Sequence, residues 1–475
     1  MPSTLIQRNL YDINPVHKEF MFALKNDAAV SGIPIAYYNV KFVAEVHIAG
    51  DTINLSVVAD VIATLKVIPN NEGVGIFDFS QICESFVRPQ NMGFADTTVS
   101  SEWKGNPFTY NPHSIHIIDK FCLNDKGFKN LAAQLKVEAS TSVGGPVSIV
   151  SNSAINVTGM QIFNGYLTEE AVLTRTGSTA SLPISYGWSE LSNYFSNGTS
   201  DFVLSNAPAI QYANEGDYGV MCFFNRTSYP ITSVEYDLRD FSNTSTIINV
   251  TNVTANGGAP PTSKTNTQML SVGVFPGNLM NTNATFYSMI TGGTLSHYFV
   301  YLKQSGGRRT QKYRININCS PDGKGYEPIR LAWLNQLGGW DYYTFTKKST
   351  VSLATKKTTY TQLAGTWNGI GYEVQGWKGG KKAFRVNATE TIKMNTDFIS
   401  EDDANWFEFL INSPEVYIIK PYALADTDAQ KLTNRYVIPV RLKTSKYVRK
   451  TVANNRLIQY TFEIEKSKKL RTQNA

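Results

Sequence analysis

The sequence predicts a mainly β protein, with tandem antiparallel β-sandwich domains followed by a C-terminal α+β module that contains one short helix. Three observations support this fold class. The chain has 475 residues, which is too many for one ordinary core. It contains 25 Tyr and 25 Phe and is rich in Thr, Val, Ile and Asn, a composition that favours strands and turns. Long stretches of helical periodicity are nearly absent, whereas several short runs alternate with a period of two.

Residues 1–167 are predicted to form an N-terminal β-sandwich. The first 36 residues are expected to be an extended arm or the first strand, because their prolines disfavour helix. Residues 40–48 alternate between apolar and polar side chains, as in a strand with one buried face. Residues 168–200 are interpreted as a linker of mixed charge, which attaches to a neighbouring domain through Trp188, Tyr194 and Phe195.

Residues 201–345 are predicted to form a second β-sandwich. Its expected strands are the apolar runs 219–224, 233–238, 268–274, 296–302 and 312–317. Residues 243–266 interrupt them with a low-complexity sequence of Asn, Thr and Ser that also contains Gly-Gly and Pro-Pro pairs. Such a composition predicts a long exposed loop or a mobile hairpin.

The strongest apolar and aromatic signal lies in residues 329–345, which read IRLAWLNQLGGWDYYTF and which we name the seam. Both ends of the seam alternate with a period of two, which is typical of strands, and Gly338-Gly339 permits a sharp turn between them. We expect the seam to supply the last strands of the second domain and to join it to the C-terminal module. Its predicted structural residues are Leu331, Trp333, Leu337, Gly338, Gly339, Trp340, Asp341, Tyr343 and Phe345.

Two features of the seam allow a functional interpretation beside the structural one. Its aromatic side chains could stack on sugar rings, but aromatic residues that alternate within apolar strands are more often core. Asp341 could be a functional carboxylate with a perturbed pKa. A structural hydrogen bond from loop N–H groups explains an aspartate next to a tight turn more simply.

Residues 346–475 are predicted to form a basic C-terminal β module with a helix near 400–412. Ser400 is the expected N-cap, acidic residues fill the first turn, and Asp403 occupies the position where a capping box has Glu or Gln. From Asp341 onward the chain has 22 Lys/Arg and 13 Asp/Glu, a net charge of +9, whereas the preceding part has 22 and 25, a net charge of −3. This asymmetry is either a solvated basic face or a contact with an acidic neighbour.

The sequence contains no constellation that would support catalysis. It lacks a GxSxG elbow and a phosphate-binding GxxxxGK[ST] loop, and its four cysteines and five histidines do not have metal-ligand spacing. We therefore expect no catalytic, cofactor-binding or metal-binding residues, and free thiols rather than disulfides. The N-terminus has no secretory signal, no run is long enough to anchor the chain in a membrane, and the patterns of nucleic-acid-binding modules are missing.

Three segments in this order resemble virion structural proteins of tailed phages that infect Bacteroidetes, the crAss-like group among them. They are the seam, the run from Asn395-Thr396-Asp397 to Pro414-Glu415-Val416-Tyr417, and the closing Asn455-Arg456-Leu457-Ile458-Gln459-Tyr460-Thr461-Phe462-Glu463. The resemblance is strongest over residues 310–475, and it brings no assigned functional residues.

The resemblance implies a non-enzymatic subunit of a tail, a baseplate or a head-to-tail ring, found in the virion and assembled in the host cytoplasm. The implied partners are further copies of the chain in a cyclic ring and other tail or connector proteins. The alternative is a tail protein that binds host-surface glycans through exposed aromatic residues. A ring subunit is expected to bury its aromatic residues and self-assemble, whereas a glycan binder is expected to expose two or three of them in a groove.

Overall fold

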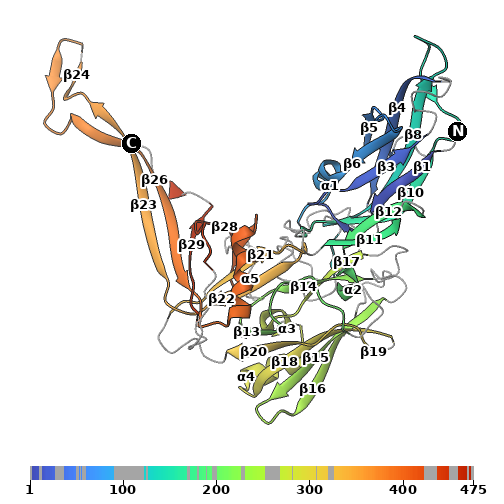
Figure 1. The fold of residues 1–475 in the computed structure, drawn as a ribbon. Helices are drawn as coiled ribbons and strands as arrows, with labels where there is room; N and C mark the ends of the chain where they lie inside the picture. Colours follow the sequence, from blue (N-terminus) through green and yellow to red (C-terminus); the bar gives the residue numbers. More distant parts are fainter. Residues whose placement is uncertain are drawn as a thin grey trace.

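A computed structural model confirms a mainly β chain, with 55% of residues in strands and 11% in helices. The molecule is V-shaped, with the N-terminal sandwich on one side, a long β-hairpin on the other and the second β domain at the base (Figure 1). The structure describes residues 3–471 except 10–12, 27–36, 50–52, 54, 56–59, 90–121, 125–126, 168–171, 179–180, 189, 195–199, 226–229, 252–267, 281, 306, 319–325, 368, 422–435, 449–457 and 468–469.

The N-terminal domain is a sandwich of two sheets. One sheet has the order β11-β12-β1-β3-β6, and the other has the order β2-β10-β8-β4-β5, with β9 paired to β8. Apolar side chains from both sheets, such as Phe22 and Phe42, fill the core between them. The bounds are β1 (Thr4–Asn9), β2 (Ile13–Pro15), β3 (Met21–Lys25), β4 (Tyr38–Ala49), β5 (Ala63–Val67), β6 (Val74–Asp78), α1 (Ser80–Phe86), β8 (Phe128–Ser140), β9 (Ser148–Ile149), β10 (Ile155–Phe163), β11 (Val172–Ser178) and β12 (Ser181–Trp188).

The first residues form a strand, one of the two predicted alternatives, and not an arm, because β1 pairs in parallel with β12 and antiparallel with β3. Most of the predicted linker is the β11–β12 hairpin of the same sheet. Trp188 does attach it to the second domain, since the indole is buried in the core cluster that contains the side chains of that domain, whereas Phe195 lies outside the described residues.

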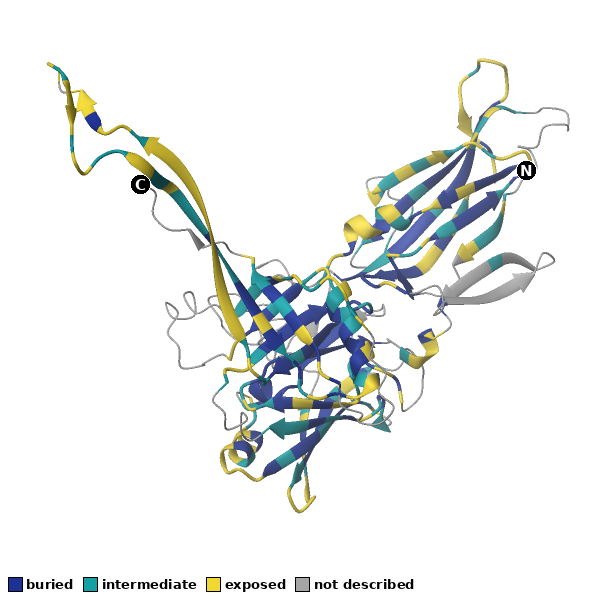
Figure 2. Cartoon of the chain, turned by 60° about the vertical axis from the view of Figure 1, so that its left-hand side comes forward, coloured by how far each residue is buried: buried dark blue, intermediate teal, exposed yellow. Residues whose placement is uncertain are grey.

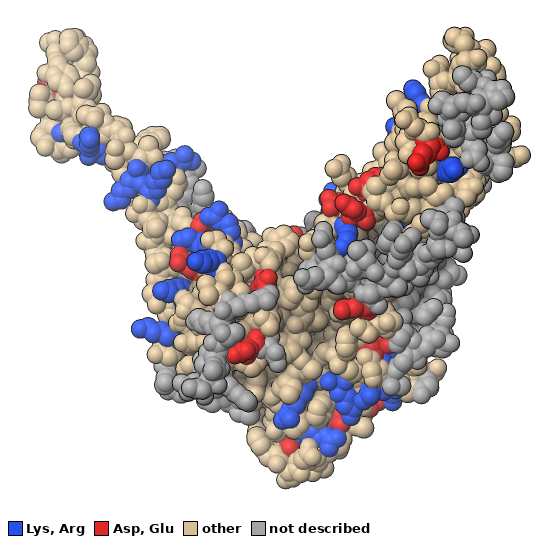
Figure 3. Space-filling view, viewed as in Figure 1, with Lys and Arg blue, Asp and Glu red and all other residues tan. Residues whose placement is uncertain are grey.

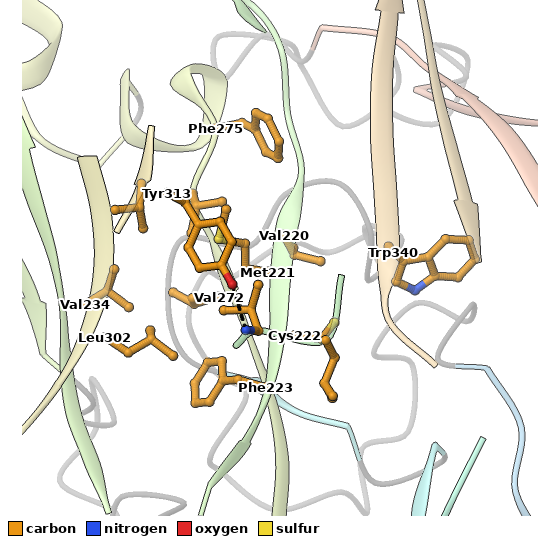
Figure 4. Close-up of a cluster of buried hydrophobic side chains, with 14 of the residues drawn as sticks. Val220, Met221, Cys222, Phe223, Val234, Val272, Phe275, Leu302, Tyr313 and Trp340 are labelled. Atoms are coloured by element: carbon orange, nitrogen blue, oxygen red, sulfur yellow. Dashed lines mark hydrogen bonds between the residues drawn. The ribbon is translucent and has the colours of Figure 1, made fainter. Parts of the chain in front are cut away.

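The second domain also has two sheets. One has the order β13-β20-β18-β15-β16, with β19 paired to β18, and the other has the order β14-β17-β7. Every residue of β14 is buried, because the strand has a core on each side. Phe223 points toward Val234 and Leu302, whereas Cys222 lies on the side of Trp340 (Figure 4). The bounds are β7 (Cys122–Leu123), α2 (Leu191–Tyr194), β13 (Ile210–Asn214), β14 (Val220–Asn225), β15 (Ile231–Asp240), β16 (Ser245–Thr251), β17 (Gln268–Gly273), α3 (Pro276–Met280), α4 (Ala284–Thr291), β18 (Leu295–Gln304), β19 (Gly307–Arg308) and β20 (Tyr313–Asn318).

The predicted loop 243–266 is partly a strand. Residues 245–251 form β16, which pairs antiparallel with β15 and buries Ile248. Its sequence, STIINVT, is rich in β-branched residues that fit a strand with one buried face, and this local preference outweighs the low complexity of the whole segment. Residues 252–266 lie outside the described residues.

The C-terminal module is one large sheet with a helix packed on it. The eight-stranded sheet has the order β22-β21-β27-β28-β29-β26-β23, with β30 paired to β26. Helix α5 places Trp406, Phe407 and Leu410 in the core against this sheet. The bounds are β21 (Ile329–Leu334), β22 (Trp340–Phe345), β23 (Thr350–Gln362), β24 (Gly365–Trp367), β25 (Tyr372–Val374), β26 (Gly380–Asn395), α5 (Glu401–Asn412), β27 (Val416–Ile419), β28 (Val437–Leu442), β29 (Thr461–Lys466) and β30 (Leu470–Arg471).

The seam strands belong to this C-terminal sheet. We predicted that they close the second domain, but β21 pairs antiparallel with β27 as well as with β22. The paired residues of β21 and β27 are 83 to 89 positions apart in the sequence, from Trp333–Val416 to Arg330–Ile419. Periodicity predicts that a segment is a strand and says nothing about which distant strand it pairs with, so the sequence alone could not place the seam in a sheet.

Candidate functional site

The seam hairpin is buried on both faces, between two separate cores. Leu331, Trp333 and Phe345 belong to the core of the C-terminal module. Ala332, Leu334, Trp340 and Tyr342 belong to the core of the second domain, on the opposite face of the same two strands. Successive side chains of a strand point to opposite faces, so a hairpin with apolar side chains on both faces can fix two cores to each other. Leu337, Gly338 and Gly339 are also buried, and Tyr343 is half-buried.

Asp341 accepts hydrogen bonds from three different parts of the chain. Its Oδ1 accepts from Ser205 Oγ at 2.6 Å and from Asn335 Nδ2 at 2.9 Å. Its Oδ2 accepts from Trp406 Nε1 at 2.8 Å and from the backbone N–H of Asn206 at 3.3 Å. The seam carboxylate thus connects the start of the second domain, the seam loop and helix α5. We expected loop N–H groups to donate to Asp341. One of its four donors is a backbone N–H, and the other three are side chains.

Burial raises the pKa of Asp341, and the hydrogen bonds from Ser205, Asn335 and Trp406 oppose that rise. A buried carboxylate with a raised pKa can mark a catalytic site. Here each carboxylate oxygen accepts hydrogen bonds from two donors of the protein. This arrangement favours a structural role for Asp341 over a catalytic one.

A second buried polar contact joins the seam to the second domain. Arg330 donates from Nε to the backbone oxygen of Tyr218 at 2.8 Å and from Nη1 to Asp217 Oδ2 at 3.2 Å. Its guanidinium also lies over the Phe275 ring, 4.4 Å from the centroid. Thr344 Oγ1 donates to the same Asp217 oxygen at 2.7 Å. A buried cation needs such a paired and hydrogen-bonded environment, so this contact fixes the orientation of β21 against the second domain.

The seam loop, residues 335–339, also contacts the N-terminal sandwich. The backbone N–H of Tyr166 donates to the backbone oxygen of Gln336 at 2.7 Å. Gly338 has a φ of +75°, and a Cβ at this position would lie 2.3 Å from the backbone oxygen of Asn164. A Cβ at Gly339 would lie 2.2 Å from the backbone oxygen of Leu204. Gly338 is required because a side chain would strain its backbone angle and would clash with Asn164, whereas at Gly339 a side chain would clash with Leu204. The loop therefore packs directly against two neighbouring segments.

Helix α5 begins at the predicted cap. Ser400 Oγ accepts from the Asp403 N–H at 3.1 Å, and Asp403 Oδ2 accepts from the Ser400 N–H at 3.4 Å. Both halves of a capping box are therefore present with Asp in place of Glu or Gln. The cap fixes the start of the helix that carries Trp406 to Asp341.

We expect Ser400→Ala to lower the free energy of unfolding by about 1 kcal/mol, because it leaves the Asp403 N–H without its side-chain acceptor. Urea denaturation measures this change. Ser400→Thr is the matched control and should cost less, since a threonine oxygen can also cap a helix. Equal losses for the two variants would show that the cap hydrogen bond contributes nothing to stability.

A long two-stranded hairpin protrudes from the C-terminal sheet; it comprises residues 350–395, and we name it the ribbon. It is built from β23 and β26, which pair antiparallel from Thr350–Lys393 to Gln362–Gly380. Twelve of the 13 residues of β23 are exposed, and the ribbon extends away from the rest of the chain (Figure 2). At about 3.3 Å per residue, a strand of this length spans roughly 40 Å. A two-stranded hairpin is at best marginally stable alone in water, so such a ribbon is suited to bind a partner.

The end of the ribbon is apolar. The ribbon tip, as we name residues 363–378, carries a small hairpin of β24 and β25. Its side chains include Trp367, Ile370 and Trp377, which are 71%, 98% and 72% exposed. Leu363, Tyr372 and Val374 are exposed beside them. Single exposed apolar residues are ordinary, but several together at one end of an extended element indicate an interaction site.

The ribbon is also basic. Residues 350–395 contain seven Lys/Arg and two Glu, a net charge of +5. The positive side chains lie along the middle of the ribbon, whereas its end is almost uncharged (Figure 3). The ribbon therefore carries more than half of the net charge of +9 that the chain has from Asp341 onward.

A groove of about 360 Å³ lies where the second domain meets the C-terminal module. Strand β13 forms one side, and β22, residues 397–399 and α5 form the other. Ile210, Tyr212 and Phe398 are exposed at the groove, and the charged residues among the described part of its lining are Asp397 and Asp403. Two predicted residues, Tyr343 and Asp403, line it, together with Trp406. The groove is therefore aromatic and acidic.

The described residues contain no group of three or more His, Cys, Asp or Glu side chains that could hold a metal ion. Cys83 and Cys222 are buried free thiols, and burial raises their pKa values to about 12 and about 11. Such thiols are unreactive, because the thiolate is the reactive form.

Among the described residues, no helix has the length and apolar character needed to cross a membrane. Comparison with protein-family models gives no match, and comparison with curated proteins gives no match either.

The ribbon and the groove were not found by our sequence reasoning. A signal for the ribbon was present, because TVSLATKKTTYTQ and GKKAFRVNATETIKMN are both rich in Thr, Lys and Val and flank a Gly-rich segment with two tryptophans. Such paired runs predict a hairpin. The groove has no comparable signal, since it depends on how β13 and the C-terminal module are placed relative to each other.

Proposed function

We propose that this chain is a non-enzymatic structural subunit of a tailed-phage virion, which builds an oligomeric tail, baseplate or head-to-tail ring. The observation that carries the proposal is the ribbon, a strand pair of which one strand exposes 12 of 13 residues and whose end is apolar. Strand β23 contributes little to the core of its own chain and offers a large surface to a neighbour, whereas the base of β26 belongs to the C-terminal sheet. The resemblance of the seam and the C-terminal segments to phage virion proteins supports the same conclusion.

The arrangement of the seam supports a rigid subunit. One hairpin fixes the core of the second domain to that of the C-terminal module, and its loop contacts the N-terminal sandwich. A building block that carries load between neighbours needs such fixed connections between its parts. The proposed location is the virion, after assembly in the host cytoplasm with other tail or connector proteins.

We expect the purified chain to form a ring-sized species whose fraction rises with protein concentration and falls as salt increases. The reason is that the basic ribbon places charge at the proposed contact, and salt screens charges that are exposed at an interface. Mass photometry across concentration and ionic strength measures the distribution of masses. A strict monomer at every concentration and salt would contradict self-assembly.

A glycan-binding tail protein is the second candidate, and one observation favours it. Trp367, Tyr372 and Trp377 are exposed aromatic residues at the ribbon tip, and such rings can stack on sugars. They lie on a protruding hairpin instead of lining a concave surface, which is the usual form of a small-ligand site. Saturable binding of host-surface polysaccharide that is lost in Trp367→Ala would favour this candidate.

A further inference from the structure

We propose that the ribbon tip of one copy of this chain binds in the groove of a second copy. The inference rests on the proposed self-assembly and specifies the contact that produces it. Four properties of the two surfaces support it: reach, size, polarity and charge.

The tip does not meet the groove of its own chain. The ribbon leaves the C-terminal sheet at β23 and β26 and carries its tip to the far end of the molecule from β13 (Figure 1). The two strands are paired from Thr350–Lys393 to Gln362–Gly380, a length of roughly 40 Å, which places the tip far from the sheet. The apolar tip side chains and the groove can therefore be brought together only by a second molecule.

The groove suits a large apolar side chain. Its volume of about 360 Å³ is near the lower end of the range of ligand sites, roughly 300–1,000 Å³, and would accommodate one or two large side chains. Tyr212 and Phe398 are 64% and 57% exposed at its rim, and Tyr343 and Trp406 line it. Aromatic side chains that fill an aromatic-lined pocket are the usual centre of a protein interface. Trp367 and Trp377 of the tip are side chains of this kind.

The charges of the two surfaces are complementary. The tip itself carries Lys378 and Glu373, and the adjacent part of the ribbon adds Lys381 and Lys382, which leaves this end of the ribbon net positive, whereas the described charged residues that line the groove are Asp397 and Asp403. Lys347 forms an ion pair with Asp397 at 3.4 Å, but half of the Asp397 side chain stays exposed. Asp403 is partly engaged in the helix cap. Complementary potentials guide association and fix its orientation.

A tip-to-groove contact is heterologous, because the two surfaces are different patches of the same chain. Each copy would offer its tip to one neighbour and its groove to another. Contacts of this type repeat head to tail and produce a closed ring, or a filament where the rotation does not close. The inference therefore explains how one protein species builds the assembly proposed above.

Two variants and their mixture test the contact. The tip variant carries Trp367→Ser and Trp377→Ser, and the groove variant carries Tyr212→Arg and Phe398→Arg. All four residues are exposed, so the fold should be retained, as circular dichroism can verify. The matched control is Tyr287→Ser, an exposed aromatic residue on α4 that belongs to neither surface.

We expect each variant alone to raise the apparent dissociation constant of the assembly by roughly 30-fold or more, as truncation of aromatic interface anchors does. Their equimolar mixture should form a 1:1 heterodimer and nothing larger, because the groove variant supplies an intact tip and the tip variant an intact groove. Tyr287→Ser should assemble like the wild type. Mass photometry distinguishes all of these species.

Three results would overturn the inference. If both variants assemble like the wild type, copies associate through another surface, and the proposed structural function survives without this contact. If each variant is monomeric but their mixture gives no heterodimer, the tip and the groove do not bind each other. If the wild type stays monomeric while its tip binds polysaccharide or another virion protein, the occupant of the groove is not a second copy, and self-assembly fails as well.

Discussion

We expect Asp341→Ala to lower the free energy of unfolding by about 3–5 kcal/mol. The substitution removes the acceptor of four hydrogen bonds, which come from Ser205, Asn206, Asn335 and Trp406. The buried Trp406 indole N–H would lose its carboxylate acceptor, and Asn335 Nδ2 would keep only the backbone oxygen of Leu204; a buried donor without a partner costs about 1–3 kcal/mol. The effect is large because these donors come from separate parts of the chain. Urea denaturation followed by tryptophan fluorescence measures it.

The matched control for this prediction is Asp60→Ala, since Asp60 is exposed. It should change the free energy of unfolding by no more than about 0.5 kcal/mol. A loss at Asp341 as small as the loss at Asp60 would mean that the four donors find other acceptors, and that the seam carboxylate does not hold the second domain and helix α5 together.

Asp341→Asn tests the pKa of the same group. Burial raises that pKa above its usual value of 3.8, so the folded protein retains the proton to a higher pH than the unfolded chain does. The resulting stability is fully present below pH 3.8 and is lost as the pH rises through the folded-state pKa. Asparagine does not titrate. The stability advantage of the wild type over Asp341→Asn should therefore shrink as the pH rises, and an advantage that grows with pH would contradict the raised pKa.

The sequence predicted the features that depend on local chemistry. The β class follows from composition and period-two alternation, and the start of α5 follows from Ser400 and the acidic first turn. The burial of Trp333 and Trp340 follows from their position within apolar strands. Each of these properties is determined by residues that are close together in the chain.

The features that the sequence did not predict depend on distant partners. The β11–β12 hairpin was interpreted as a linker because its pairing with β1 joins residues far apart in sequence. The groove requires β13 to lie beside the C-terminal module, and no local pattern encodes that placement. The ribbon is different, because its two strands are neighbours and their composition was informative. It was missed because the exposure of β23 on both faces goes with a sequence that lacks sustained apolar alternation, the pattern by which strands are usually recognised.

We expect Gly338→Ala to lower the free energy of unfolding by about 3–5 kcal/mol. Part of the loss is the left-handed backbone, since φ is +75° at this residue and an L side chain at such an angle costs about 1–2 kcal/mol. The larger part is steric, because the added Cβ would lie 2.3 Å from the backbone oxygen of Asn164. A backbone atom within a packed sandwich cannot move away as a flexible side chain can. Thermal and urea denaturation of the two proteins measure the loss.

Gly144→Ala separates these two contributions. Gly144 has a φ of +73°, nearly the same as Gly338, but a Cβ there would have no atom within 4 Å. It should therefore cost only the left-handed backbone, about 1–2 kcal/mol. The difference between the two losses of unfolding free energy is the steric cost of moving the seam loop away from the N-terminal sandwich. If both substitutions lower the free energy of unfolding equally, the seam loop can move at no cost in free energy. The contact between the seam loop and the N-terminal sandwich would then not stabilise the fold.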